Sequence, residues 1–168
     1  MKKLKEDIFL VLCGMIELDE FETRLYTNPV VIDKLEEPGF ILDVVCLNYG
    51  DKWVFEQLRA LAFEEYEYEE YLVFKLEKLC YELLKTQSCD QINAVCNRIL
   101  AGVDSYPAYS LFNKFRYLED YYYFVRSGDC LEEEYVDEIH KEAREVVNGF
   151  RNKTLSEKKE LLYDSVLE

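Results

Sequence analysis

The only histidine of the chain, His140, is the first candidate for catalysis or metal binding. It lies in the segment EEEYVDEIHKE, three residues after Asp137, and a carboxylate and an imidazole at that spacing share one face of a helix. A di-iron helical bundle needs two such motifs and two further inward glutamates, which one histidine does not supply. The helical periodicity also places Ile139 inward and His140 toward solvent. We therefore predict no catalytic residue and no metal ligand at this position.

The six cysteines could bind zinc, form disulfides or act as nucleophiles. Zinc sites often use paired C-x-x-C or C-x-x-H units, and none occurs here, since Cys89 and Cys96 are seven residues apart. A cysteine nucleophile needs a base, and His140 is the only imidazole. A free thiol in an apolar run behaves as a small hydrophobic side chain, and such runs hold Cys13, Cys46, Cys80 and Cys96. We therefore expect free thiols in a reducing cytosol.

The charge and the missing motifs exclude several classes of protein. The chain contains neither G-x-x-x-x-G-K nor G-x-G-x-x-G, the loops that cradle phosphates. Its net charge of −15 repels nucleic acid and anionic lipid surfaces and favours encounter with a basic partner. No stretch approaches the length of about 18 apolar residues that a membrane span needs. We predict a cytoplasmic protein that is not an enzyme, has no cofactor, and binds neither nucleic acid nor membrane.

The first of two segments that combine tyrosines with carboxylates is FEEYEYEEYLVF, from Phe63 to Phe74. Its five glutamates need partners if they are to be buried, so we expect a bend that leads into the next helix, whose dipole stabilises acids near its N-terminus. We expect the two phenylalanines in the core and the tyrosines exposed among carboxylates. The candidate partner-binding residues, here named the first cluster, are Glu64, Glu65, Tyr66, Glu67, Tyr68, Glu69 and Glu70.

The second segment is LEDYYYFVRSG, from Leu118 to Gly128. Successive helical residues point about 100° apart, so three consecutive tyrosines do not all face one core. We expect Tyr122 to belong to the buried apolar stripe that includes Phe115. Tyr121 and Tyr123 then lie on the two flanks of that stripe. Tyrosine is enriched at binding hot spots, and carboxylates around it attract a cationic partner. The candidate residues of this second cluster are Glu119, Asp120, Tyr121 and Tyr123. The alternative is that these tyrosines are half-buried spacers.

Apolar residues at helical spacing, separated by capping signals, predict an all-α fold. We expect a compact bundle of about ten short to medium helices, without a β-sheet, in a single domain over residues 1–168. The run from Phe40 to Tyr49 could be a strand by composition, although its length and neighbours favour a helix. An α-solenoid remains an alternative without support from a fixed-period repeat. The predicted helix ends are marked by Asp19, Asn28, Asp51, Ser88, Pro107, Gly128, Asp129 and Thr154.

The stretch over about residues 5–62 resembles small bacterial immunity proteins of polymorphic or contact-dependent toxin systems. Their typical order is a Gly-Ile turn, an "EFE..LY" helix, an "LNY" helix and an "EL..L" helix. Arg24 departs from that pattern, which has an aromatic residue before the "LY" pair. The matching pieces are Gly14–Ile16, Glu20–Glu22, Leu25–Tyr26, Leu47–Tyr49, Glu56 and Leu58–Leu61.

The resemblance implies a bacterial protein that binds and neutralises one cognate toxin domain and performs no reaction. With the acidic, tyrosine-rich segments, it predicts a basic toxin, with a nuclease as one candidate activity. We expect the inhibitor to be a monomer or a weak homodimer. Two alternatives stay open. One is a helical adaptor or regulatory interaction module without a toxin partner, and the other is an enzyme that binds a metal through acidic clusters.

Overall fold

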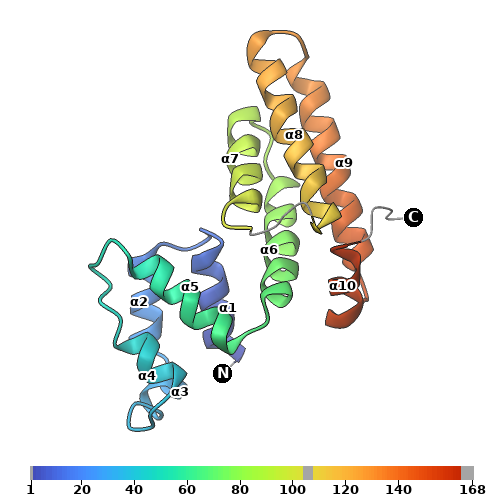
Figure 1. The fold of residues 1–168 in the computed structure, drawn as a ribbon. Coiled ribbons are helices and arrows are strands. Elements are labelled where there is room, and N and C mark those ends of the chain that lie inside the picture. Colours follow the sequence, from blue (N-terminus) through green and yellow to red (C-terminus); the bar gives the residue numbers. More distant parts are fainter. Residues whose placement is uncertain (1, 104–107, 164–168) are drawn as a thin grey trace. The chain divides into compact units, whose positions relative to one another are not determined.

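The computed structural model describes residues 2–103 and 108–163 of the chain. These residues form ten α-helices and no strand, so the prediction of an all-α fold is confirmed. Figure 1 shows the course of the helices. The chain divides into two compact units, Met1–Tyr71 and Leu72–Glu168. The division falls within helix α6 (Tyr68–Leu83), and each unit has its own buried apolar residues. The single domain over residues 1–168 stays a prediction.

The N-terminal unit contains five complete helices that are mostly short. Helix α1 contacts both α2 and α5, and α4 also contacts α5. The run that begins at Phe40 is a helix, as its length and neighbours indicated. The helices are α1 (Lys2–Leu12), α2 (Leu18–Tyr26), α3 (Pro29–Ile32), α4 (Phe40–Val45) and α5 (Val54–Glu65).

A buried carboxylate links α1 to α2. The Oδ1 atom of Asp7 accepts a hydrogen bond of 2.8 Å from Nη1 of Arg24, and Asp7 itself is buried. The Nη2 atom of the same guanidinium donates to Glu20 at 2.5 Å. The hydrogen bonds to Asp7 and to Glu20 raise the pKa of Arg24, in that order of importance. Arg24 therefore holds α1 and α2 together through charge.

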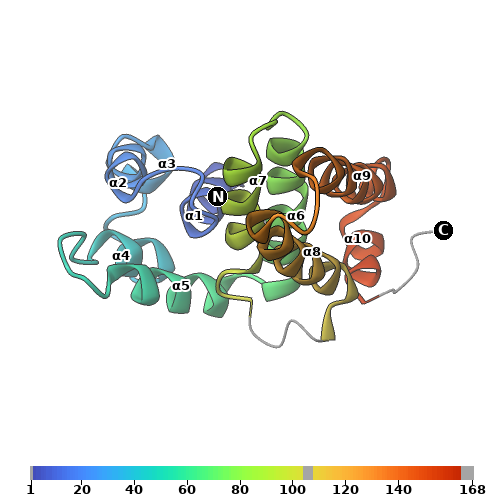
Figure 2. The ribbon, with the colours of Figure 1, turned by 90° about the horizontal axis from the view of Figure 1, so that it is seen from above.

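The C-terminal unit is built around three helices that lie side by side (Figures 1 and 2). They are α7 (Cys89–Leu100), α8 (Ser110–Ser127) and α9 (Glu132–Phe150), followed by the short α10 (Leu155–Leu161). Helix α8 contacts both α7 and α9. It buries one stripe of apolar side chains between them, formed by Leu111, Phe112, Phe115, Leu118 and Val125.

Two buried polar side chains bind helix ends within this unit. Lys75 on α6 is 1 % exposed, and its Nζ donates to the carbonyl oxygen of Ala101, the C-cap of α7, at 2.5 Å. His140 on α9 is 8 % exposed, and its Nε2 lies 3.0 Å from the carbonyl oxygen of Leu83 and 2.8 Å from that of Thr86. Because carbonyls only accept, this nitrogen carries a proton. The prediction that His140 faces solvent is wrong, because the end of α6 covers its ring.

Three of the predicted helix ends are confirmed. The Oδ1 atom of Asn28 accepts a hydrogen bond of 3.1 Å from the backbone nitrogen of Val30, in the first turn of α3. Thr154 and Glu157 form a reciprocal capping box at the start of α10. Gly128 ends α8 with φ of +83°, a conformation that favours glycine. These signals succeed because each depends only on residues close in the chain.

The other capping predictions fail in part. Asp19 lies inside α2 and Asp129 lies before the N-cap of α9, so neither begins a helix with its own side chain. Ser88 is the N-cap of α7, but its side chain makes no capping hydrogen bond. Asp51 accepts from the backbone of the turn that precedes α5. Pro107 lies outside the described residues.

Replacing Arg24 by leucine should leave the buried Asp7 carboxylate without its cation. We expect a loss of about 2 kcal/mol in the free energy of unfolding, measured by urea denaturation. The double variant Asp7→Leu/Arg24→Leu should recover most of that loss, because it buries no unpaired charge. Lys34→Leu, which removes an exposed ion pair with Glu37, serves as the control and should change stability by less than about 1 kcal/mol. Equal losses in the single and double variants would contradict this role of the pair.

Replacing His140 by alanine should expose the last carbonyls of α6 to an unfilled, largely apolar space. We expect the free energy of unfolding to fall by about 2 kcal/mol, from the lost hydrogen bonds and the cavity. Lys141→Ala, at the neighbouring exposed position, is the matched control and should change stability by about 0.5 kcal/mol or less. If the two variants unfold at the same urea concentration, His140 does not stabilise the end of α6.

Candidate functional site

The carboxylates of the first cluster surround the turn between α5 and α6. Glu64 and Glu65 end α5, Glu67 follows in the turn, and all three side chains are exposed. Glu69 and Glu70 lie in the first turn of α6, where the helix dipole favours negative charge. Of these two, Glu70 also accepts a hydrogen bond of 2.6 Å from Lys5. The predicted bend, with acids near the start of the following helix, is therefore confirmed.

The tyrosines of this segment turn inward. The ring of Tyr66 packs edge-to-face against Phe9 and Phe40, with centroid distances of 5.7 and 5.3 Å. Its hydroxyl is buried without a hydrogen-bond partner among the described residues, and burial raises the pKa of Tyr66 to about 12. Tyr71 is buried as well and donates to the carbonyl oxygen of Leu12 at 3.1 Å. Tyr66 and Tyr68 were the candidates for exposure in this cluster, and both are half-buried, so that prediction is wrong for both.

The two phenylalanines at the ends of this segment differ from expectation too. Phe63 and Phe74 are half-buried, although both were expected in the core. Phe63 packs against Tyr68, which is itself half-buried, with a centroid distance of 4.9 Å. The N-terminal unit is small and its helices are short, so it needs the apolar area of its aromatic rings. The rings of Phe63, Tyr66 and Tyr71 fill its interior and its edge. What this segment presents to solvent is mainly charge.

The residues of the second cluster lie on α8 and point in different directions around the helix. Glu119 is half-buried and accepts a hydrogen bond of 2.6 Å from Arg116, one turn earlier. Asp120 is exposed and makes no ion pair with any residue in the described ranges. Tyr121 is half-buried against Tyr135 of α9, with a centroid distance of 5.8 Å. Tyr123 is 73 % exposed. The structure therefore leaves one tyrosine and one carboxylate of this cluster fully accessible.

Two further aromatic side chains of α8 are exposed, and neither was identified from the sequence. Tyr117 is 75 % exposed and Phe124 is 50 % exposed. The sequence spacing indicates such a pair, because Tyr117 and Phe124 are seven residues apart and residues at that spacing share a side of a helix. Both lie outside the apolar stripe through Phe115. Together with Tyr121 and Tyr123 they form a surface that we name the α8 aromatic face.

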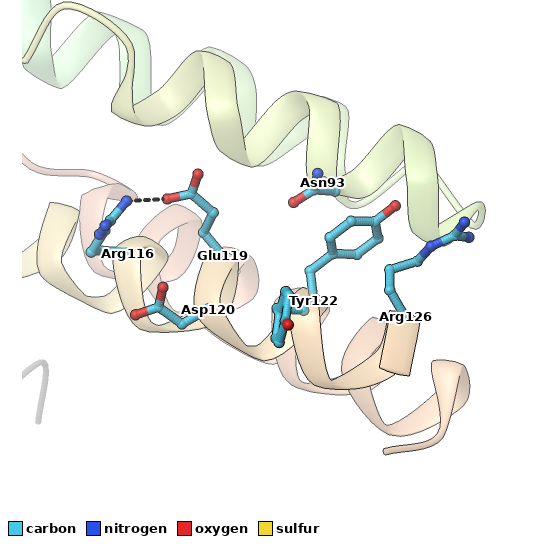
Figure 3. Close-up of a pocket in the computed structure, with 7 residues that line it drawn as sticks. Asn93, Arg116, Glu119, Asp120, Tyr122 and Arg126 are labelled. Atoms are coloured by element: carbon cyan, nitrogen blue, oxygen red, sulfur yellow. Dashed lines mark hydrogen bonds and ion pairs between the residues drawn. The ribbon is translucent and has the colours of Figure 1, made fainter. Parts of the chain in front are cut away.

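A shallow pocket of about 410 Å³ lies beside Tyr123, between α7 and α8. Figure 3 shows Asn93 projecting from α7 toward α8. The hydroxyl of Tyr122 donates to Asp90 at 2.6 Å, and this hydrogen bond raises the pKa of Tyr122. Tyr122 is therefore half-buried against α7, and the prediction that it belongs to the buried apolar stripe is wrong. The pocket also contains two cations and two carboxylates, Arg116, Arg126, Glu119 and Asp120, so it selects no single sign of charge.

Two buried thiols, Cys80 and Cys96, are poor candidates for nucleophiles. All six cysteines are free. Burial raises the pKa of Cys80 well above its ordinary value, and raises that of Cys96 to about 12. Both thiols are therefore protonated at neutral pH, and a thiol is a poor nucleophile. Cys46 is exposed at the end of α4, where the apolar run had suggested burial.

No three side chains of the metal-binding types converge on a common point within residues 2–103 and 108–163. None of the helices in the described ranges combines the length and hydrophobicity of a membrane span. No protein-family model matches the chain, and no significant match is found among curated proteins or solved structures. The resemblance to immunity proteins over residues 5–62 stays a prediction, and the site must be interpreted from its own chemistry.

Replacing Tyr66 by phenylalanine removes a buried hydroxyl without a hydrogen bond, so we expect the free energy of unfolding to rise by about 1 kcal/mol at pH 7. The pKa of about 12 in the folded protein exceeds the ordinary tyrosine value of 10.0, so the stabilising contribution of Tyr66 is complete below pH 10 and is lost as pH rises toward 12. The advantage of the variant should therefore grow above pH 10. Urea denaturation at neutral and alkaline pH tests this, with Tyr123→Phe as the exposed control. A variant less stable than the parent would show that the hydroxyl has a partner.

Proposed function

We propose that the chain is an immunity-type protein of the bacterial cytoplasm, which binds and neutralises a cognate, basic toxin domain. The observation that carries this proposal is the α8 aromatic face, where Tyr117 is 75 % exposed and Tyr123 is 73 % exposed on a chain of net charge −15. The resemblance of residues 5–62 to immunity proteins points in the same direction. The proposed mechanism is binding alone, without a reaction.

The composition of this face supports a binding role. Folding does not require Tyr117, Tyr123 or Phe124 to be aromatic, because their rings lie largely outside the buried stripe of α8. A helix side that only faces water is normally charged or polar. Exposed aromatic groups that gather on one side are typical of protein interaction sites, and tyrosine gives a rigid contact area at a small cost in entropy.

The surrounding carboxylates indicate what kind of partner fits. Asp120 lies within the aromatic face and has no ion pair among the described residues, so a partner's lysine or arginine can bind it. A toxin domain that acts on nucleic acid needs such basic residues to bind phosphates. Carboxylates and stacked rings at the same position would occupy those residues and block the substrate. This supports a nuclease as one candidate for the toxin.

The first cluster takes a different role in this proposal. Its exposed carboxylates, Glu64, Glu65 and Glu67, add to the negative field that accelerates the encounter with a basic partner. Its tyrosines fill the N-terminal unit and provide no exposed anchor. We therefore assign contact to the second cluster together with Tyr117 and Phe124, and long-range attraction to the first cluster.

A survival assay tests the proposal. The C-terminal domain of the protein encoded immediately upstream is expressed with and without this chain, and viable cells are counted. We expect the wild-type chain to rescue growth, and Tyr117→Ser/Tyr123→Ser to lose rescue, because the contact area is gone. Tyr81→Ser removes a tyrosine that is 46 % exposed on α6 and serves as the matched control. Charge reversal at Glu64, Glu65 and Glu67 should slow association about tenfold at low salt.

Each failure has a distinct meaning. An upstream domain that is harmless, or toxicity that the wild-type chain does not relieve, rejects immunity and favours the helical adaptor. Rescue that survives the α8 double variant and is lost on charge reversal at Glu64, Glu65 and Glu67 moves the contact surface to the first cluster.

A further inference from the structure

Three residues of the α8 aromatic face form a row along the helix. Tyr117, Tyr121 and Phe124 are spaced by four and then three residues, which returns to the same side of an α-helix over about two turns. This spacing is the one at which two helices pack side by side in a coiled coil. Tyr121 is half-buried at the middle of the row, and the two outer rings are exposed.

Helix α9 supplies the other wall beside this row. A shallow groove is lined by Tyr121 from α8 and by Glu134, Asp137, Glu138, Lys141 and Arg144 from α9. Lys141 already neutralises Glu138, since its Nζ donates to that carboxylate at 3.1 Å. Glu134 and Asp137 make no ion pair with any residue that the structure describes. Tyr121, the middle residue of the aromatic row, therefore lies beside two carboxylates that are in no ion pair among the described residues, and the same wall also carries Lys141 and Arg144.

We infer that this groove binds a basic amphipathic helix of the partner, an inference that rests on the proposed function. A helix repeats its apolar side chains at the spacing of the row, so its leucine or isoleucine residues pack against Tyr117, Tyr121 and Phe124. Lysine or arginine residues along one flank of that helix then reach Glu134 and Asp137. An extended strand repeats every second residue and needs an open sheet edge, and residues 2–103 and 108–163 form no strand.

A pair of synthetic peptides tests the groove on the full chain. One peptide has leucine at helical spacing and arginine along the flank, and the other has the same composition in scrambled order. Binding is measured by fluorescence anisotropy, and peptide helicity by circular dichroism. We expect the patterned peptide to bind about tenfold more tightly and to gain helix on binding. Equal affinities of the two peptides would overturn the inference, since charge alone would then explain binding.

Variants of the chain locate the bound peptide. Tyr117→Ser and Phe124→Ser should each weaken the patterned peptide about tenfold, because both rings are exposed contact residues whose loss leaves the core intact. Asp137→Lys should weaken it and reduce its dependence on salt. Glu160→Lys makes the same change of charge at an exposed position on α10 and should have a much smaller effect. If Asp137→Lys and Glu160→Lys weaken binding equally, the peptide does not occupy the groove.

The outcome can be separated from that of the survival assay. If the chain prefers the patterned peptide at this groove but does not rescue cells, the groove is a helix-binding site and its partner is not the toxin. A chain that rescues cells but shows no preference between the peptides keeps the immunity function, and the inference of a helical partner segment is then overturned.

Discussion

Packing of one apolar stripe on α8 against α7 and α9 sets the rotation of that helix, and the rest of the proposed site depends on it. Once Phe115 and Leu118 are buried, the rotation of about 100° per residue leaves no freedom for their neighbours. Tyr122 is directed toward α7, Tyr121 toward α9, and Tyr123 toward solvent. Which residues of α8 are exposed is therefore a consequence of core packing. The unusual feature is that aromatic residues, where polar residues are normal, stand at these solvent-facing positions.

The two acidic segments share a composition and differ in their physical role. In the N-terminal unit the rings of Tyr66 and Tyr71 complete the packing around Phe9, so the first cluster presents mainly charge to solvent. In the C-terminal unit the long helices already bury enough aliphatic surface, and aromatic rings can remain outside. In the proposed function the two segments would act in sequence, because a field that extends over a Debye length affects association and contacts at the interface affect dissociation.

Several buried polar side chains inside each unit bind helix ends or one another. Asp7 pairs with Arg24, Lys75 binds the end of α7, and His140 binds the end of α6. Each contact joins elements distant in the chain, so it restricts how those helices pack. The only imidazole thereby stabilises the end of α6, which contradicts the expectation that it faces solvent.

The sequence by itself determined the helical fold class, the helix ends at Asn28, Gly128 and Thr154, and the acidic bend before α6, because these features depend on residues within a few positions of one another. Only the tertiary structure decided which tyrosines are exposed and where His140 lies. A half-apolar side chain such as tyrosine fits both a core edge and a surface, so its own neighbours in the chain do not settle its position. The packing partner settles it: Phe9 and Phe40 cover Tyr66, while no described helix covers Tyr117.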